Sequence, residues 1–245
     1  MIRGDGPLVI IPAYNEERTV GSVVEALVAD GFRILVIDDG SVDQTSAIAR
    51  SFGATVLRLP INLGVGGALR AGFRYAIANG YTSVIQIDAD GQHPVSQISD
   101  LLSAGEASEA HLIIGSRYLS VDATHTPSFP RRLSMRLLSA VASHFAGVRL
   151  TDTTSGFRLI RQPLLAAFAE EFPNYYLGDT YEATVAAVRG GYKVVEIPAA
   201  LAPRLHGSSS VTTGRAIGLI AKVLIITLTG LHPKIRPIPS GASIN

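Results

Sequence analysis

Two carboxylates lie close together in the segment Asp88-Ala89-Asp90, directly after a mostly apolar run at residues 84–87. Carboxylate oxygens are ligands for Mg²⁺, which keeps several waters and shares its site with phosphates, and Mn²⁺ accepts the same ligands. Most Asp-x-Asp pairs are solvated surface residues, but the apolar run favours a position at the end of a buried strand. The segment is therefore a candidate site for a divalent cation.

A second acidic segment, Asp38-Asp39-Gly40-Ser41, follows the apolar run at residues 34–37. A carboxylate in this position could accept a hydrogen bond from a nucleobase N–H or from a ribose hydroxyl. The same residue types also favour tight turns that bind no ligand. Both interpretations stay open on the sequence alone.

Three arginines could recognise phosphate, because a guanidinium group binds phosphate oxygens through paired hydrogen bonds. They are Arg117, Arg158 and Arg204, and each of them taken alone is better interpreted as a surface charge. The spacing of His93 and His206 matches no metal-binding motif. Both histidines are therefore interpreted as polar residues of a site wall.

Asp152 and Asp179 are the remaining acidic candidates. Asp179 directly precedes a predicted helix, so an N-cap role is slightly favoured for it. Asp152 is also compatible with a structural role, in which it supports the loop at residues 153–158.

The first half of the chain alternates between predicted strands and helices. Apolar or mostly apolar runs predict strands at residues 8–11, 34–37, 55–59, 84–87 and 112–114. Helices are predicted at residues 44–52 and 64–78, and a further helix is opened by Pro94. Asn15 is expected to cap the helix after the first strand, with Glu16 and Glu17 in its first turn. This order predicts an α/β fold with a parallel, doubly wound sheet, in which both acidic segments face one crevice at the carboxyl ends of strands.

The second half of the chain is less regular and ends in an apolar helix. We expect a polar loop at residues 120–129, helices at residues 131–145 and 179–189, and strands at residues 157–160 and 192–197. The C-terminal helix at residues 214–231 is apolar over most of its surface. That pattern favours contact with a membrane surface or a partner over simple core packing.

Composition excludes several classes of protein. The chain has 245 residues, of which 47% are apolar, and this is enough for a large folded domain. The net charge of +1 provides no overall field that would attract nucleic acid. The sequence contains no cysteine, so disulfides, thiolate metal sites and a catalytic thiol are all excluded.

Several of these segments, taken in order, resemble family 2 glycosyltransferases of the GT-A fold, specifically the polyprenyl-phosphate (dolichol-phosphate mannose synthase-like) branch. The resemblance rests on residues 9–17, 38–41, 62–66, 88–94, 115–117 and 155–158, and on Arg204 with Gly207 and Ser209. It implies a Rossmann-like, mostly parallel sheet followed by a C-terminal amphipathic helix. It also implies a glycosyltransferase domain at residues 1–210, with a nucleotide-sugar-binding half at 1–117, an acceptor half at 118–210, and a helix with a basic, proline-rich tail at 211–245.

The resemblance further implies that Mg²⁺ or Mn²⁺ binds the diphosphate of a UDP- or GDP-sugar. Asp90 and Gln92 would hold the metal, and Asp88 would lie near the metal, the base, the ribose or the donor phosphate. The nucleoside would be surrounded by Pro12, Tyr14, Glu16, Ala89 and either Asp38 or Asp39. Arg117 and Arg204 would neutralise phosphate charge.

On the acceptor side, the resemblance implies a segment that grips a lipid phosphate. This segment would comprise Arg131, Arg132 and Ser134, and Ser155 would also bind the acceptor phosphate. A phosphate acceptor is already anionic at neutral pH, so inverting displacement at the sugar needs no strong base. An acceptor hydroxyl would need a general base, for which Asp179 is the first candidate and Asp152 the second.

The sequence also departs from this branch in two respects. Ser210 stands where the branch usually carries lysine, so charge on the leaving diphosphate would fall to the metal and to Arg204. The branch often ends in transmembrane helices, whereas no run here reaches about 18 apolar residues. We therefore expect a peripheral protein on the cytoplasmic face of the membrane, anchored by a separate small membrane protein or acting as a homo-oligomer.

Other functions compete with this one. A soluble family 2 transferase could act on the hydroxyl of a saccharide or of a secondary metabolite. A non-catalytic nucleotide-sugar-binding protein would have no need to keep Asp88, Asp90 and Arg204 together. A nucleotidyltransferase would show a glycine-rich loop near the first strand, and residues 12–15 do not form one.

Overall fold

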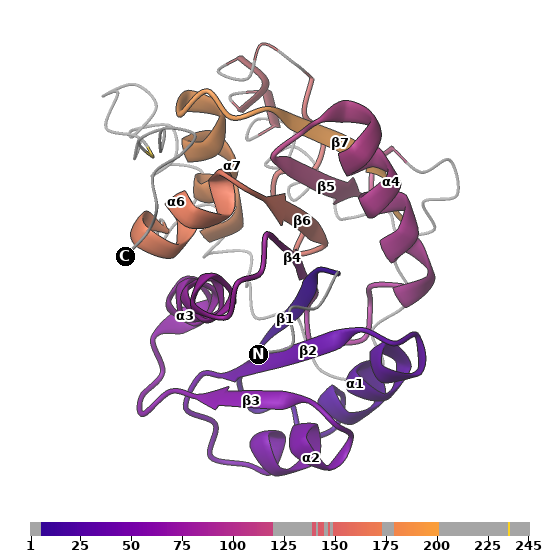
Figure 1. The fold of residues 1–245 in the computed structure, drawn as a ribbon, viewed down its shortest axis with the longest axis vertical. Coiled ribbons are helices and arrows are strands. Elements are labelled where there is room, and N and C mark those ends of the chain that lie inside the picture. Colours follow the sequence, from indigo (N-terminus) through magenta and orange to yellow (C-terminus); the bar gives the residue numbers. More distant parts are fainter. Residues whose placement is uncertain are drawn as a thin grey trace, which may run out of the picture.

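The computed structural model of the protein describes residues 6–119, 139–140, 142–144, 147, 149–172, 179–200 and 235. At its centre is a seven-stranded sheet in the order β3-β2-β1-β4-β6-β5-β7 (Figure 1). The strands are β1 Leu8–Ala13, β2 Arg33–Asp38, β3 Thr55–Arg58, β4 Ser83–Gln86, β5 Leu112–Ser116, β6 Arg158–Arg161 and β7 Val194–Pro198. The predicted α/β fold with a mostly parallel sheet is confirmed.

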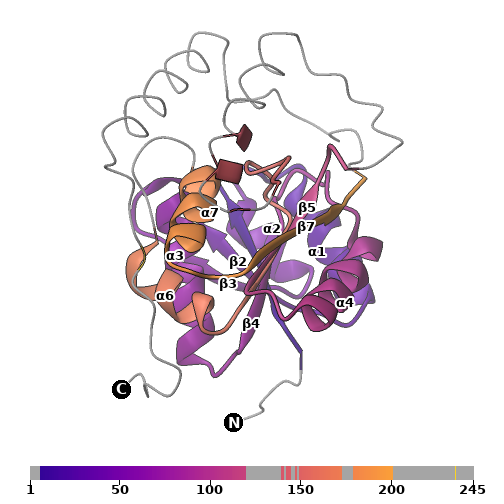
Figure 2. The ribbon, with the colours of Figure 1, turned by 90° about the horizontal axis from the view of Figure 1, so that it is seen from above.

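Helices cover both faces of this sheet. They are α1 Val20–Ala29, α2 Thr45–Ser51, α3 Gly64–Ala78, the short 3₁₀ helix η1 Val95–Gln97, α4 Ile98–Ser108, α6 Leu164–Glu171 and α7 Asp179–Arg189. Helices α3, α6 and α7 pack against one face, and α1, α2 and α4 pack against the other (Figure 2). None of the helices in the described part of the chain has the length and apolar composition needed to cross a membrane.

Strand β1 shows how one apolar run serves both layers. Successive side chains of a strand point to opposite faces of the sheet. Ile10 therefore belongs to the core beneath α3 and α6, while Ile11 belongs to the core beneath α1 and α4. A strand buried on both faces has no polar alternation, which is why the sequence shows an unbroken apolar run here.

Strand β6 is the antiparallel strand of this mostly parallel sheet. Strand β1 pairs in parallel with β2 and β4, and β5 pairs in parallel with β7. Strand β6 lies between β4 and β5 and is antiparallel to both. The reason is the connection: the chain leaves β5 at its carboxyl end and re-enters the sheet at the same edge, so the next strand must run the opposite way.

The start of α1 differs from the predicted one. Asn15 does not cap it, since the helix begins at Val20 and its N-cap position is Thr19. The side chain of Asn15 instead accepts a hydrogen bond from the backbone N–H of Val42 at 3.0 Å. The backbone N–H of Glu16 donates to the Thr45 hydroxyl oxygen at 2.8 Å. These contacts hold the residues after β1 against the loop after β2, so the helix begins later.

Helix α6 was not predicted, because its apolar residues lack a helical spacing. All positions from Leu164 to Ala169 are buried, so the helix shows no polar face in the sequence. The predicted helices at residues 64–78 and 179–189 are confirmed with the same bounds. The loop at residues 120–129, the C-terminal helix at 214–231 and most of the helix at 131–145 lie outside the described residues.

Candidate active site

Both acidic segments lie at one edge of the sheet. The parallel strands β1 and β2 end side by side, with Ala13 paired to Asp38. Strand β4 lies on the other side of β1, and the backbone N–H of Ile87 donates to the carbonyl oxygen of Ile10 at 3.1 Å. The residues that follow β1, β2 and β4 therefore emerge from three neighbouring strands at their carboxyl ends, where open α/β sheets bind ligands.

Asp38 is buried and its carboxylate is used within its own loop. Oδ1 accepts the backbone N–H of Ser41 at 2.8 Å, and Oδ2 accepts the hydroxyl of Ser46. Nε of Arg58 lies 3.8 Å from Oδ2 of Asp38. Burial alone would raise the pKa of Asp38, but the hydrogen bonds from Ser41 and Ser46 and the charge of Arg58 outweigh it, so the pKa is lowered. These contacts favour the turn interpretation of Asp38.

Asp39 is also buried but has different partners. Its Oδ1 accepts the backbone N–H of Leu63 at 2.7 Å, at the start of α3. Burial raises the pKa of Asp39, and the nearby charge of Asp38 raises it further, against hydrogen bonds from Leu63 and Gly64. Asp39 thus connects the loop after β2 to the loop before α3.

The loop after β1 lies beside these aspartates. Pro12 is paired with Ile37 within the sheet, and Tyr14 is 47% exposed at the strand's end. The carboxylate of Glu16 accepts the hydroxyl of Thr19 at 2.8 Å. The structure therefore brings Pro12, Tyr14 and Glu16 to the same edge as Asp38 and Asp39.

Asp88 follows β4, and its carboxylate contacts His93 in the same loop. Oδ2 lies 3.1 Å from Nε2 of His93, and the Asp88 side chain is 42% exposed. Partial burial raises the pKa of Asp88, but the hydrogen bond and charge of His93, with the positive charges of Arg117 and Arg158, lower it overall. The carboxylate therefore stays ionised at neutral pH, as a ligand for a cation must.

Asp90 and Gln92 lie in the turn that follows. The backbone N–H of Gln92 donates to Oδ1 of Asp90 at 3.1 Å, and Ala89 between the two aspartates is buried. In the described part of the chain, no three or more His, Asp or Glu side chains gather into a complete metal cage. Two carboxylates and an amide oxygen nevertheless match the oxygen ligands of Mg²⁺ and Mn²⁺, whose other positions are taken by waters and phosphates. The donor set fits the predicted metal.

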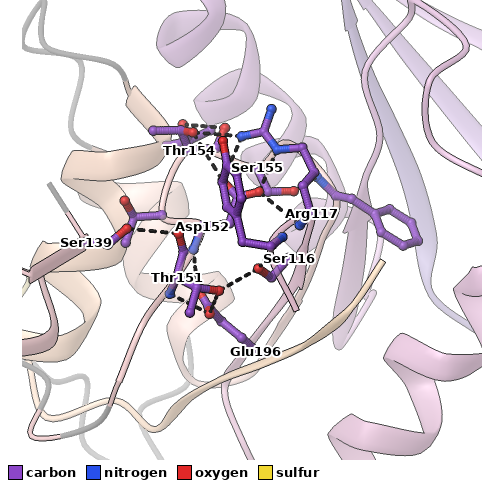
Figure 3. A network of polar contacts seen from close by, with 12 residues as sticks. Ser116, Arg117, Ser139, Thr151, Asp152, Thr154, Ser155 and Glu196 are labelled. Atoms are coloured by element: carbon purple, nitrogen blue, oxygen red, sulfur yellow. Dashed lines mark hydrogen bonds and ion pairs between the residues drawn. The ribbon is translucent and has the colours of Figure 1, made fainter. Parts of the chain in front are cut away.

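Arg117 and Asp152 form a bidentate ion pair (Figure 3). Nε of Arg117 donates to Oδ2 at 2.5 Å, and Nη2 donates to Oδ1 at 2.6 Å. The hydroxyl of Thr154 accepts a further bond from Nη2 at 2.8 Å. The Asp152 carboxylate is fully buried and occupied by these donors, which favours the structural role over that of a base.

Glu196 was missed by sequence reasoning. It lies on β7, and its carboxylate accepts the backbone N–H of Thr151 at 2.7 Å and of Asp152 at 2.8 Å (Figure 3). The hydroxyl of Thr151 donates to the same carboxylate at 2.7 Å and also contacts the hydroxyl of Ser116. The signal in the sequence was a single charged residue within an apolar strand, which is a weak one.

The interpretation of Arg158 as a surface charge is wrong. Its side chain is fully buried at the start of β6. Nε donates to the carbonyl oxygen of Ser155 at 2.6 Å, and Nη2 donates to that of Thr153 at 2.7 Å. Burial lowers the pKa of Arg158 to about 10, against the charges of nearby carboxylates, and it remains charged at neutral pH. The guanidinium group therefore supports a loop.

The remaining candidates are placed only in part. Ser155 is buried, and its hydroxyl oxygen accepts the backbone N–H of Phe157 at 3.2 Å. Asp179 is the first residue of α7, and its side chain lies outside the described residues. The other predicted residues that lie outside them are Arg131, Arg132, Ser134, Arg204 and His206.

Comparison with known proteins decides the family. The model of a protein family described as glycosyl transferase family 2 matches residues 8–168, which include β1 to β6 and both acidic segments. The chain belongs to this family. The family predicted from the sequence motifs is thereby confirmed.

Relatives of this family 2 glycosyltransferase include two with named lipid acceptors. It is 38% identical over 120 residues to the polyprenol monophosphomannose synthase of Mycolicibacterium smegmatis, covering 46% of this chain and 45% of that one. It is 39% identical over 119 residues to the undecaprenyl-phosphate mannosyltransferase of Micrococcus luteus, covering 45% and 47%. The matches thus span about half the length of these relatives. They support the predicted branch.

Solved structures show that the glycosyltransferase fold is shared. The chain superposes with a TM-score of 0.64, at 21% identity, on glucosyl-3-phosphoglycerate synthase from Mycobacterium tuberculosis in complex with Mn²⁺ and UDP-glucose, covering 96% of this chain and 81% of that one. A mannosyltransferase from Pyrobaculum calidifontis, in complex with GDP-mannose and Mn²⁺, gives a TM-score of 0.56 at 18% identity, covering 78% and 54%. The predicted GT-A fold is confirmed.

Proposed function

We propose that this protein transfers a sugar from a UDP- or GDP-sugar to a polyprenyl phosphate at the cytoplasmic face of a membrane. The observation that carries the proposal is the meeting of two acidic segments, residues 38–41 and 88–90, at one edge of the sheet. The first segment and the loop after β1 suit a nucleoside, and the second suits a diphosphate with its metal. The named relatives support a lipid phosphate as acceptor.

In this proposal the donor lies across the carboxyl ends of β1, β2 and β4. Asp88, Asp90 and Gln92 would hold Mg²⁺ or Mn²⁺, which when bound neutralises charge on the departing diphosphate. The nucleoside would lie against Pro12, Tyr14, Glu16, Ala89 and either Asp38 or Asp39. Arg117 is held by Asp152 close to the same edge, where its charge favours phosphate.

The acceptor oxygen would attack the anomeric carbon while the bond from that carbon to the diphosphate oxygen breaks, with inversion. Arg131, Arg132, Ser134 and Ser155 would bind the acceptor phosphate, and Arg204 would share the charge of the leaving group. We also propose that residues 211–245 hold the protein at the membrane, together with a small membrane protein or a second copy of the chain. A phosphate acceptor requires no strong base.

The test is an assay of the purified protein with Mg²⁺ or Mn²⁺, a panel of UDP- and GDP-sugars, and short-chain polyprenyl phosphate. Labelled sugar is expected in the organic phase, and the product should disappear with EDTA or in the Asp90→Ala variant. Asp100→Ala is the matched control, because Asp100 is exposed on α4. Donor hydrolysis without an organic-phase product would move the acceptor to a hydroxyl. No consumption of any donor would favour a nucleotide-sugar-binding protein without catalysis.

The variant Asp179→Asn separates the two acceptor classes. We expect a rate close to that of the wild type, because a phosphate acceptor is already anionic. A loss of about 100-fold or more would show that Asp179 acts as a general base and that the acceptor is a hydroxyl. The melting temperature of the variant checks that it folds.

A further inference from the structure

The carboxylate of Asp88 lies close to residues of two loops, the loop after β4 that carries His93 and the loop before β6 that carries Gly156. Nε2 of His93 lies 3.1 Å from Oδ2. The backbone of Gly156 also lies close to this carboxylate. A Cβ atom at position 156 would overlap both carboxylate oxygens of Asp88 and would lie 2.6 Å from its Cγ. No side chain fits between this loop and the carboxylate.

His93 is itself held by the loop before β6, which carries Gly156 and Phe157. Its ring stacks on Phe157 with ring centroids 5.3 Å apart and an angle of 15° between the planes. The His93 side chain is only 4% exposed, and Phe157 is fully buried. Since Phe157 follows Gly156 in the chain, one loop contacts both the carboxylate and the histidine that binds it.

The loop before β6 is anchored by contacts that do not involve Asp88. Gln86 of β4 pairs with Arg158 of β6, which brings the end of one strand beside the start of the other. The guanidinium group of Arg158 holds the carbonyl of Ser155, and the backbone N–H of Gly115 donates to the carbonyl of Phe157 at 2.9 Å. Gly156 therefore cannot retreat easily, and a side chain there must displace the carboxylate.

We propose that His93, Phe157 and Gly156 are positioning residues that fix the orientation of the Asp88 carboxylate toward the donor diphosphate. The role of Asp88 at the donor rests on the proposed function; the contacts that hold it do not. Gly156 does not adopt the left-handed conformation that favours glycine, so its backbone accepts alanine. Glycine is needed at this position because of the space that the carboxylate occupies.

The first test is Gly156→Ala, with Gly6→Ala as the matched control. A Cβ at position 6 would meet no atom within 4 Å, and the φ of Gly6 is also ordinary. We expect Gly156→Ala to weaken the binding of UDP or GDP in the presence of Mn²⁺ by about tenfold or more, as for other residues that orient a metal-binding carboxylate. Titration calorimetry measures this dissociation constant, and Gly6→Ala should leave it unchanged.

A double variant shows whether the effect passes through Asp88. In the Asp88→Ala background the carboxylate is gone, so adding Gly156→Ala should cause no further loss of binding. The melting temperature should show the same pattern, with a loss from Gly156→Ala in the wild type and none in the Asp88→Ala background. Equal losses in both backgrounds would overturn the proposal, because the alanine would then be disturbing something else.

His93 is tested by variants that separate its ring from its hydrogen bond. His93→Phe keeps a ring to stack on Phe157 but cannot donate to Asp88, and we expect about tenfold weaker nucleotide binding. His93→Gln places an amide N–H near the position of Nε2 and should recover part of the loss. If His93→Phe binds as tightly as the wild type, His93 does not position Asp88.

Failure of the proposed function can be distinguished from failure of the positioning role by whether the wild type binds the nucleotide. If the wild type binds neither UDP nor GDP with Mn²⁺, the donor assignment fails, while the melting temperatures of the double-variant series still test the contact. A crystal structure of Gly156→Ala then decides the matter. A carboxylate turned away from His93 supports the proposal, and one left in place contradicts it.

Discussion

At the scale of single residues, Asp38 and Asp39 are adjacent in the chain but are held by different contacts. Asp38 accepts bonds from Ser41 and Ser46 and lies near Arg58. Asp39 has backbone donors before α3 and the like charge of Asp38 beside it. The pKa of Asp38 is therefore lowered and that of Asp39 is raised, and the two must affect stability oppositely as the pH changes.

A pair of asparagine variants tests this opposition. A lowered pKa means that Asp38 stabilises the fold above its unfolded pKa, and that this contribution disappears as pH falls through the folded value. A raised pKa means that the contribution of Asp39 is present below its unfolded pKa and is lost as pH rises through the folded value. Asp38→Asn should thus lose more unfolding free energy at about pH 6 than at about pH 3. Asp39→Asn should lose less unfolding free energy at about pH 6 than at about pH 3.

Urea denaturation of the wild type and of both variants at the two pH values measures these differences. Asparagine does not titrate, so the difference between the two pH values isolates the ionisation of the aspartate that it replaces. The same pH dependence in both variants would contradict the assignment of opposite shifts.

At the scale of elements, the loop at residues 151–157 is held by three strands. Arg117 follows β5, Glu196 lies on β7 and Arg158 begins β6. Each of them contacts a different part of the loop through charged hydrogen bonds. Because this loop also carries Gly156 beside Asp88, strands β5, β6 and β7 are connected through it to the residues that follow β4.

Glu196→Gln should lower the free energy of unfolding by about 1–3 kcal/mol. An amide nitrogen cannot accept a hydrogen bond, so Thr151 or Asp152 loses the acceptor for its backbone N–H. Chemical denaturation measures the change. Glu25→Gln is the matched control, because Glu25 is exposed on α1 and its variant should stay close to the wild type. Equal stability of the two variants would contradict the anchoring role.

Arg158→Met should be more severe, with a loss of about 3 kcal/mol or more. The variant leaves two loop carbonyls without donors and removes the positive charge that lies among Asp88, Asp152 and Glu196. Arg50→Met, at an exposed position of α2, is the control. Similar denaturation midpoints for Arg158→Met and Arg50→Met would show that the buried charge is dispensable.

At the scale of the whole molecule, the sheet order brings together segments that are distant in the chain. Residues after β1, β2 and β4 share one edge, and the antiparallel β6 brings the loop at 151–157 to that edge as well. The two packed faces hold these strands in register. A ligand bound across the edge would contact several strands at once and should stabilise the entire fold.

The melting temperature of the intact protein tests this. A ligand at 100 times its dissociation constant raises the free energy of unfolding by about 2.7 kcal/mol. For a chain of this size that corresponds to a rise of about 5–10 °C. We expect this rise with UDP or GDP plus Mn²⁺, and none when EDTA replaces the metal. A rise that is unaffected by EDTA, or none with either nucleotide, would contradict metal-dependent donor binding.

The sequence by itself determined the elements of the first half and the places of the two acidic segments. Apolar runs such as residues 8–11 and 34–37 identify strands buried on both faces, because local composition records local burial. The acidic residues follow those runs directly, so their position at strand ends needed no tertiary information. The family motifs are also continuous stretches of chain, and so they could be recognised without the fold.

Only the tertiary structure decided the direction of β6, the burial of Arg158 and the contacts of Glu196 and Gly156. Each depends on partners far away in the chain, such as Thr151 for Glu196 and Asp88 for Gly156. Residue type alone does not distinguish a buried arginine from a surface one, nor a glycine that turns the chain from one that makes room for a carboxylate. That distinction arises because packing, unlike helix or strand periodicity, is set by which distant segments come into contact.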